Sequence, residues 1–189
     1  MRPTALLCVC AVIGLSAPLH AQGVETGTDT IRVYADAAPA CVVGQVRASN
    51  GANATFVPDS AGGTVQIAQL VDPQTAEPTA TQIALAIPAI CNSAHRLIVE
   101  SAEGGLQRAG GQPGMRGSPT SFGDFLPYNV AVGWASGSIT RTSDQPVSAD
   151  TQDAASGDIN IGIDIPAGGS VLTAGSYSDT ILIRFEPAS

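Results

Sequence analysis

The chain has 189 residues, of which 44% are hydrophobic and only 13% are charged, so it is long and apolar enough to form the core of a domain. All basic residues are arginines, and with 16 acidic residues the net charge is −8. These values exclude a nucleic-acid-binding protein and binding to an anionic membrane surface, because both need clustered basic side chains.

Residues 1–21 have the pattern of a secretory signal peptide. Arg2 precedes an apolar run over residues 5–15, and Ala21 supplies a small residue for cleavage. A run of about 11 apolar residues is too short to span a bilayer, which needs roughly 20. No later stretch is long enough either, so we expect export and no membrane span.

Cleavage after Ala21 would leave Cys41 and Cys91 as the cysteines of the mature chain. Paired thiols are normally bridged in an oxidising compartment, so we predict a disulfide between them. Closing a loop of about 50 residues contributes ~4 kcal/mol in the chain-entropy model. A metal site is the alternative, but these cysteines and His95 lack the sequence spacing of zinc ligands. The prediction is a disulfide, with no metal and no cofactor.

The mature chain is built from short runs in which apolar residues alternate with small or polar ones and which end at turn residues. These runs occupy residues 31–37, 41–46, 65–70, 83–87, 97–99, 128–134, 159–165 and 181–185. No window after the signal peptide has a convincing helical period. Seven or eight short two-faced strands predict an all-β fold, an immunoglobulin-like antiparallel β-sandwich.

Between these runs the sequence predicts loops and turns. Residues 103–121 are rich in glycine and are expected to form a long surface loop. Residues 136–156 form a polar stretch in which no strand is predicted. Pro88 is expected to end the strand before it. Tyr177 precedes the last run, where its hydroxyl either bonds back to the turn, as in an immunoglobulin tyrosine corner, or belongs to an ordinary surface turn.

The residues offer little chemistry for an enzyme. His95 is the one histidine left after cleavage, and no nucleophile-elbow motif accompanies it, so we expect a structural histidine and no catalytic residues. Asp150, Asp153 and Asp158 offer carboxylates, but their spacing fits no calcium-binding loop. We therefore expect a protein that is not an enzyme and a solvated acidic loop.

The alternating segment over residues 30–38 does not suit a closed sandwich. The linker at residues 38–40 has no glycine or Asn-Gly pair for a tight hairpin, and Pro39 biases Ala38 towards an extended conformation. The predicted strand therefore does not fold straight back onto its successor. It either continues into the next strand or leaves the domain.

Several motifs resemble the spore coat protein U domain family, which includes pilin-like subunits of archaic chaperone–usher pili. The motifs are an alternating leader before Cys41, Ile90-Cys91-Asn92 with His95-Arg96-Leu97, residues 101–106, residues 126–130 with Trp134, and the closing residues 172–180. The resemblance implies a sandwich that lacks its last strand. That strand would come first from a periplasmic chaperone and then from the N-terminal segment of another subunit.

The resemblance and the residue pattern together imply three parts: the signal peptide, a donor-strand segment at residues 22–39 and a sandwich domain at residues 40–189. The donor side chains of one parity would be Ile31, Val33, Ala35 and Ala37. The open edge that accepts them would lie along Ile181, Ile183 and Phe185.

The function predicted from this pattern is a secreted structural subunit that polymerises on the cell surface, with copies of itself or related pilins, a periplasmic chaperone and an outer-membrane usher as partners. The alternative is a self-contained extracellular binding module, for a carbohydrate for example, that uses the loop at residues 103–121.

Overall fold

The structure is a computed structural model that describes residues 31–49 and 51–188, so the predicted signal peptide lies outside the described residues. The chain divides into two units, Met1–Asp36 and Ala37–Ser189. In the part of the chain that the structure describes, no helix is long and apolar enough to cross a membrane.

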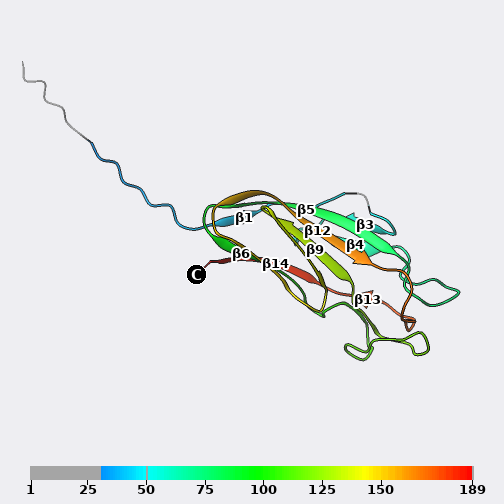
Figure 1. Ribbon diagram of the computed structural model, residues 1–189. Coiled ribbons are helices and arrows are strands. Elements are labelled where there is room, and N and C mark those ends of the chain that lie inside the picture. The colour runs from blue at the N-terminus through cyan, green and yellow to red at the C-terminus, as the bar shows by residue number, and fades with distance from the viewer. Residues whose placement is uncertain (1–30, 50, 189) are drawn as a thin grey trace, which may run out of the picture. The chain divides into compact units, whose positions relative to one another are not determined.

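The larger sheet of the second unit is antiparallel. Its strand order is β1-β5-β12-β9-β10, and β2 also pairs with β5. Figure 1 shows β5, β12 and β9 running side by side. The strands are β1 (Cys41–Val43), β2 (Arg47–Ala48), β5 (Thr81–Cys91), β9 (Asn129–Trp134), β10 (Gly137–Thr142) and β12 (Ala155–Ile165).

A smaller antiparallel sheet in the order β11-β6-β14 forms the second layer, and short strands complete the unit. The second layer consists of β6 (His95–Ser101), β11 (Val147–Thr151) and β14 (Ile181–Pro187). One short sheet joins β13 (Tyr177–Ser178), β7 (Leu106–Arg108) and β8 (Phe125–Leu126), and another joins β3 (Ala54–Val57) and β4 (Thr64–Ile67).

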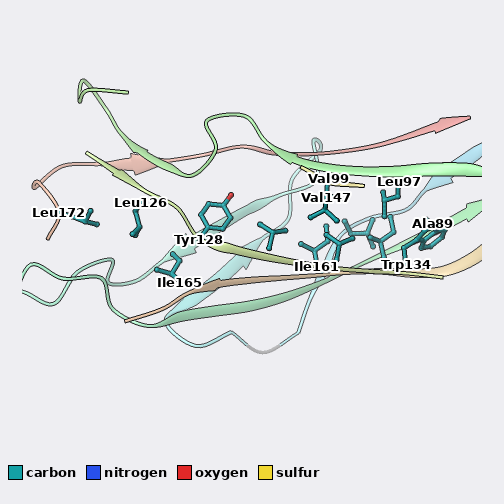
Figure 2. Packing of buried hydrophobic residues seen from close by; sticks show 14 residues of the cluster. Ala89, Leu97, Val99, Leu126, Tyr128, Trp134, Val147, Ile161, Ile165 and Leu172 are labelled. Carbon is teal, nitrogen blue, oxygen red and sulfur yellow. The ribbon is translucent and has the colours of Figure 1, made fainter. Parts of the chain in front are cut away.

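Alternate residues of the two layers form one hydrophobic core. Leu97 and Val99 of β6 extend toward Ile161 and Trp134 of the larger sheet (Figure 2), and all four are at most 4% exposed. Because successive side chains of a strand point to opposite faces, each layer buries one face and presents the other to solvent. The predicted all-β, immunoglobulin-like sandwich is thus confirmed.

Pro88 does not end its strand, contrary to the prediction, because β5 continues through it to Cys91. The Pro88 carbonyl accepts a 2.6 Å hydrogen bond from the Gly44 amide of the neighbouring segment. In an antiparallel pair the N–H and C=O of one residue face the same neighbour, so the missing N–H also faces this segment. There the pairing is interrupted between β1 and β2, and a proline is tolerated at such a break.

No strand was predicted in the polar stretch at residues 136–156, but it contains β10, β11 and the start of β12, so the acidic loop expected there is wrong as well. Both β10 and β11 are edge strands of their sheets, and few of their side chains are buried. Edge strands need little apolar alternation, so the polar sequence concealed them. For a similar reason the glycine-rich loop at residues 103–121 conceals β7, whose residues are only partly buried.

Tyr177 makes the contact of a tyrosine corner, which decides between the two readings of that turn. Its hydroxyl oxygen lies 2.7 Å from the carbonyl oxygen of Thr173 and 3.1 Å from that of Gly123. The side chain also packs against the core. The turn before β14 is therefore tied to the body of the domain.

Candidate functional site

Two edge strands, β1 of the larger sheet and β14 of the smaller one, come together at a cleft of about 330 Å³. Within residues 31–49 and 51–188, each of these strands has a hydrogen-bonded neighbour on one side only. We call this feature the β1–β14 cleft; it is lined by Pro39, Ala40, Cys41, Val43, Ser93, Ala94, His95, Phe185, Glu186 and Pro187.

The core-facing side chains of β14 are incompletely covered. Ile183 is paired in register with Val99, and Phe185 with Leu97, so each pair lies on the same face of its sheet. Val99 and Leu97 are only 2% and 1% exposed, whereas Ile181, Ile183 and Phe185 are partly exposed. The core-facing side chains of β6 are therefore covered, whereas those of the neighbouring β14 remain partly accessible to solvent.

The same contrast appears on β1. Val43 is paired in register with Ala89 of β5, and the two side chains share the core-facing side of the sheet. Ala89 is 2% exposed, but Val43 is 49% exposed. Both strands that border the cleft thus present apolar side chains that point inward and remain accessible to solvent.

An aromatic cluster lies beside the cleft and holds His95. The His95 ring makes edge-to-face contacts with Trp134 and Phe185, at centroid separations of 5.8 and 5.3 Å. Its Nε2 accepts a 2.8 Å hydrogen bond from Trp134 Nε1, so its Nδ1 carries the proton and donates to the Ser93 carbonyl at 2.7 Å. Both ring nitrogens are occupied, and His95, 1% exposed, has the structural role that the sequence predicted.

The predicted disulfide between Cys41 and Cys91 is confirmed. It joins β1 to β5, and its sulfurs lie within 4.8 Å of a ring nitrogen of His95. The fold thus brings together three residues that the sequence keeps apart, which spacing did not reveal. Because the two sulfurs are bonded to each other and the imidazole nitrogens have partners, this cluster has no free ligand atom for a metal.

The predicted donor residues lie in the chain segment before the cleft strands. The described residues 31–40 form no strand, in contrast to the strand predicted over residues 30–38. Ile31 and Val33 are 88% and 87% exposed, and Ala35 and Ala37 are exposed as well. The alternation of apolar residues gives this segment an apolar face but no hydrogen-bonding partner. A β-strand forms only when a neighbouring strand is present to pair with it. The donor role stays a prediction.

Two of the three acidic residues weighed as calcium ligands, Asp150 and Asp158, pair with arginines. Asp150 lies 2.6 Å from Arg96, and Asp158 lies 3.0 Å from Arg47. Both pairs are at the surface, where such contacts contribute little to stability.

The loop at residues 103–121, the binding site in the alternative reading, is organised by a buried carboxylate. Asp124 Oδ1 accepts from Arg108 Nε at 2.6 Å, and Asp124 Oδ2 accepts from the amide of Gln112 at 2.9 Å. The hydrogen bond from Arg108 holds the pKa of Asp124 down at about 2, below its ordinary value. The loop is therefore anchored to the body through Asp124.

We expect Asp124→Asn to destabilise the domain at pH 7. A carboxyl whose pKa is lower in the folded state stabilises the fold above its unfolded pKa of about 4, and this contribution is lost as the pH falls toward 2. The free energies of unfolding of the wild type and the variant, measured in urea, should converge over that range. Asp36→Asn, at an exposed position, is the control. A difference independent of pH would contradict the assignment.

The comparisons with known proteins give one match. The model of the Spore Coat Protein U domain matches residues 27–184, which include most of the predicted donor segment, all of β1 and the first four residues of β14. Neither the curated proteins nor the solved structures gave a match.

Proposed function

Since this chain belongs to the Spore Coat Protein U domain family, we propose that it is an exported structural subunit that polymerises by donor-strand complementation. The family is a structural one, associated with pilin-like subunits of chaperone–usher fimbriae, and is not an enzyme family. The proposal adds to this the mode of assembly and the residues that carry it.

The observation that carries the proposal is the accessible core along the β1–β14 cleft. Core-facing apolar side chains on both cleft strands are partly exposed, although their partners in the neighbouring strands are buried. An inserted strand would cover these side chains and complete the hydrogen bonding of the exposed edge. An unfilled edge of this kind favours aggregation, so a chaperone that supplies a strand in the periplasm fits the same proposal. An outer-membrane usher is the further partner that the family association implies.

The N-terminal segment has the complementary pattern. Ile31, Val33, Ala35 and Ala37 alternate with Arg32, Tyr34 and Asp36, so one face of an extended segment is apolar. Complete burial of Ile31 and Val33 would contribute about 1.5–3 kcal/mol each. A segment of one copy bound by the cleft of the next is a head-to-tail contact, which builds filaments and not closed dimers. The filament would lie at the cell surface.

The two faces of the N-terminal segment, one apolar and one not, allow a test of strand donation. In the exported full chain, Val33→Asp should abolish polymers because it places a charge in the apolar cleft, where burying an unpaired charge is costly. Tyr34→Asp is the matched control, since Tyr34 is adjacent, similarly exposed and of the opposite parity. Polymer length is measured by analytical ultracentrifugation and by electron microscopy.

The same reasoning applies to the accepting edge, where Ile183→Asp should abolish assembly and Leu182→Asp, on the outward face of β14, should not. Equal effects of the two members of a pair would contradict strand donation. A wild-type chain that stays monomeric, with residues 30–38 protected from proteolysis within one chain, would favour the alternative of a self-contained binding module.

A further inference from the structure

The side chain of Asn92 binds the backbone on both sides of Pro39. Asn92 Nδ2 donates to the carbonyl of Ala38 at 2.9 Å, and Asn92 Oδ1 accepts from the amide of Ala40 at 2.7 Å. The backbone N–H of Asn92 also donates a hydrogen bond to the Ala40 carbonyl at 3.0 Å. One residue thus satisfies three backbone groups of the linker that precedes β1.

These contacts stand directly beside the disulfide. Cys41 is paired in register with Cys91, so the bond between Ala40 and Asn92 extends the β1–β5 ladder by one position. The disulfide and the three hydrogen bonds together fix the linker at this end of the β1–β5 ladder. All these residues belong to the second unit, and we call the arrangement the Asn92 clamp.

A subunit that polymerises through its own N-terminal segment has a competing reaction. The segment and the cleft belong to one chain, and a segment tethered by a short linker has an effective concentration in the millimolar range. Separate copies at micromolar concentration would lose this competition by about a thousandfold. Closure of the chain onto itself must therefore be opposed by the geometry of the linker.

The clamp supplies that opposition. For the segment to enter the cleft of its own chain, between β1 and β14, the chain would have to reverse at residues 38–40, where tight hairpins close by a hydrogen bond across the turn. The Ala38 carbonyl and the Ala40 amide are both occupied by Asn92, and Pro39 has no N–H and disfavours a turn conformation at Ala38.

We infer that Asn92 is a positioning residue that prevents the N-terminal segment from filling the cleft of its own chain and so keeps it available to a second copy. The inference rests on the proposed function. Asn92 acts through the direction of the backbone at Pro39 and does not itself contact the donated strand.

The test uses the full mature chain, separated as monomers, and trypsin cleavage after Arg32, which reports whether the segment is accessible. In the wild type this bond should be cut rapidly. In Asn92→Ala we expect cleavage at least tenfold slower, faster hydrogen exchange at the Ala40 amide, and a correspondingly lower yield of polymer. Asn160→Ala is the control, because Asn160 is also an exposed asparagine and its side chain bonds only to the Asp158 carbonyl close by in sequence.

Cleavage of Asn92→Ala at the wild-type rate, or unchanged exchange at Ala40, would overturn the inference and leave strand donation untouched. A wild-type chain that never polymerises would instead contradict the proposed function, while the cleavage rates of the monomers still test the clamp. Should Asn92→Ala fail to fold, Asn92→Asp keeps the acceptor for the Ala40 amide and removes the donor to Ala38. We expect it to slow cleavage by a smaller factor, and no slowing would overturn the inference.

Discussion

Removal of residues 22–38 is expected to leave a folded domain that no longer polymerises. The truncated chain keeps β1, the disulfide and both layers of the core, but it loses Ile31 and Val33, whose burial in another copy would contribute at least about 3 kcal/mol together. Each 1.4 kcal/mol is a factor of ten in affinity, so association should weaken at least a hundredfold.

Circular dichroism and non-reducing electrophoresis would establish that the truncated domain is folded and disulfide-bonded, and sedimentation would measure its assembly. Because its cleft stays unfilled, we expect it to need a chaperone or an added peptide to remain soluble. A synthetic peptide of residues 30–38 should raise its melting temperature, and the same peptide with Val33→Asp should not. Polymers formed in undiminished yield by the truncated chain would refute strand donation.

Loss of the disulfide is expected to have the largest effect on stability. Cys41 and Cys91 are 50 positions apart, and freeing a loop of that length costs about 4 kcal/mol in the chain-entropy model. Whole domains are stable by only about 5–15 kcal/mol, so Cys41→Ser with Cys91→Ser should leave a barely stable domain.

Urea unfolding of the double variant and of the reduced wild type should give the same lowered free energy. β1 pairs with β5 over only three residues, so its amides should also exchange faster in the variant than those of β12. A free energy of unfolding of the double variant within about 1 kcal/mol of the wild type would contradict the chain-entropy estimate. It would show that the β1–β5 hydrogen bonds and the Asn92 clamp hold β1 without the disulfide.

The strands that sequence alternation predicted are those with one buried face. Ile159, Ile161 and Ile165 alternate with polar or small residues and are at most 1% exposed in the structure. Local periodicity reports burial directly, so β12, β9 and β6 could be read from the sequence. The edge strands β10 and β11 bury few side chains and left no such signal.

The candidate site divides in a similar way. The family resemblance and the residue pattern together proposed Ile181, Ile183 and Phe185 as an accepting edge, a role that stays a prediction. Among the described residues, these side chains belong to an edge strand and are partly exposed. The sequence did not identify the other strand of the cleft, β1. Its residue Val43 belongs to a short apolar run that looks like any core strand. Only the structure shows that Val43 is exposed to solvent while its partner in β5, Ala89, is buried.

By itself the sequence determined the all-β class, the disulfide between Cys41 and Cys91, and the apolar face of residues 31–37, because composition and period-two alternation are local properties of the chain. Only the tertiary structure decided that the core stays accessible between β1 and β14, and that Asn92 holds the backbone around Pro39. Both features depend on which residues distant in sequence become neighbours, and Asn92 and Ala40 are 52 positions apart. Pairing over such distances is set by the packing of whole sheets, to which no local pattern gives access.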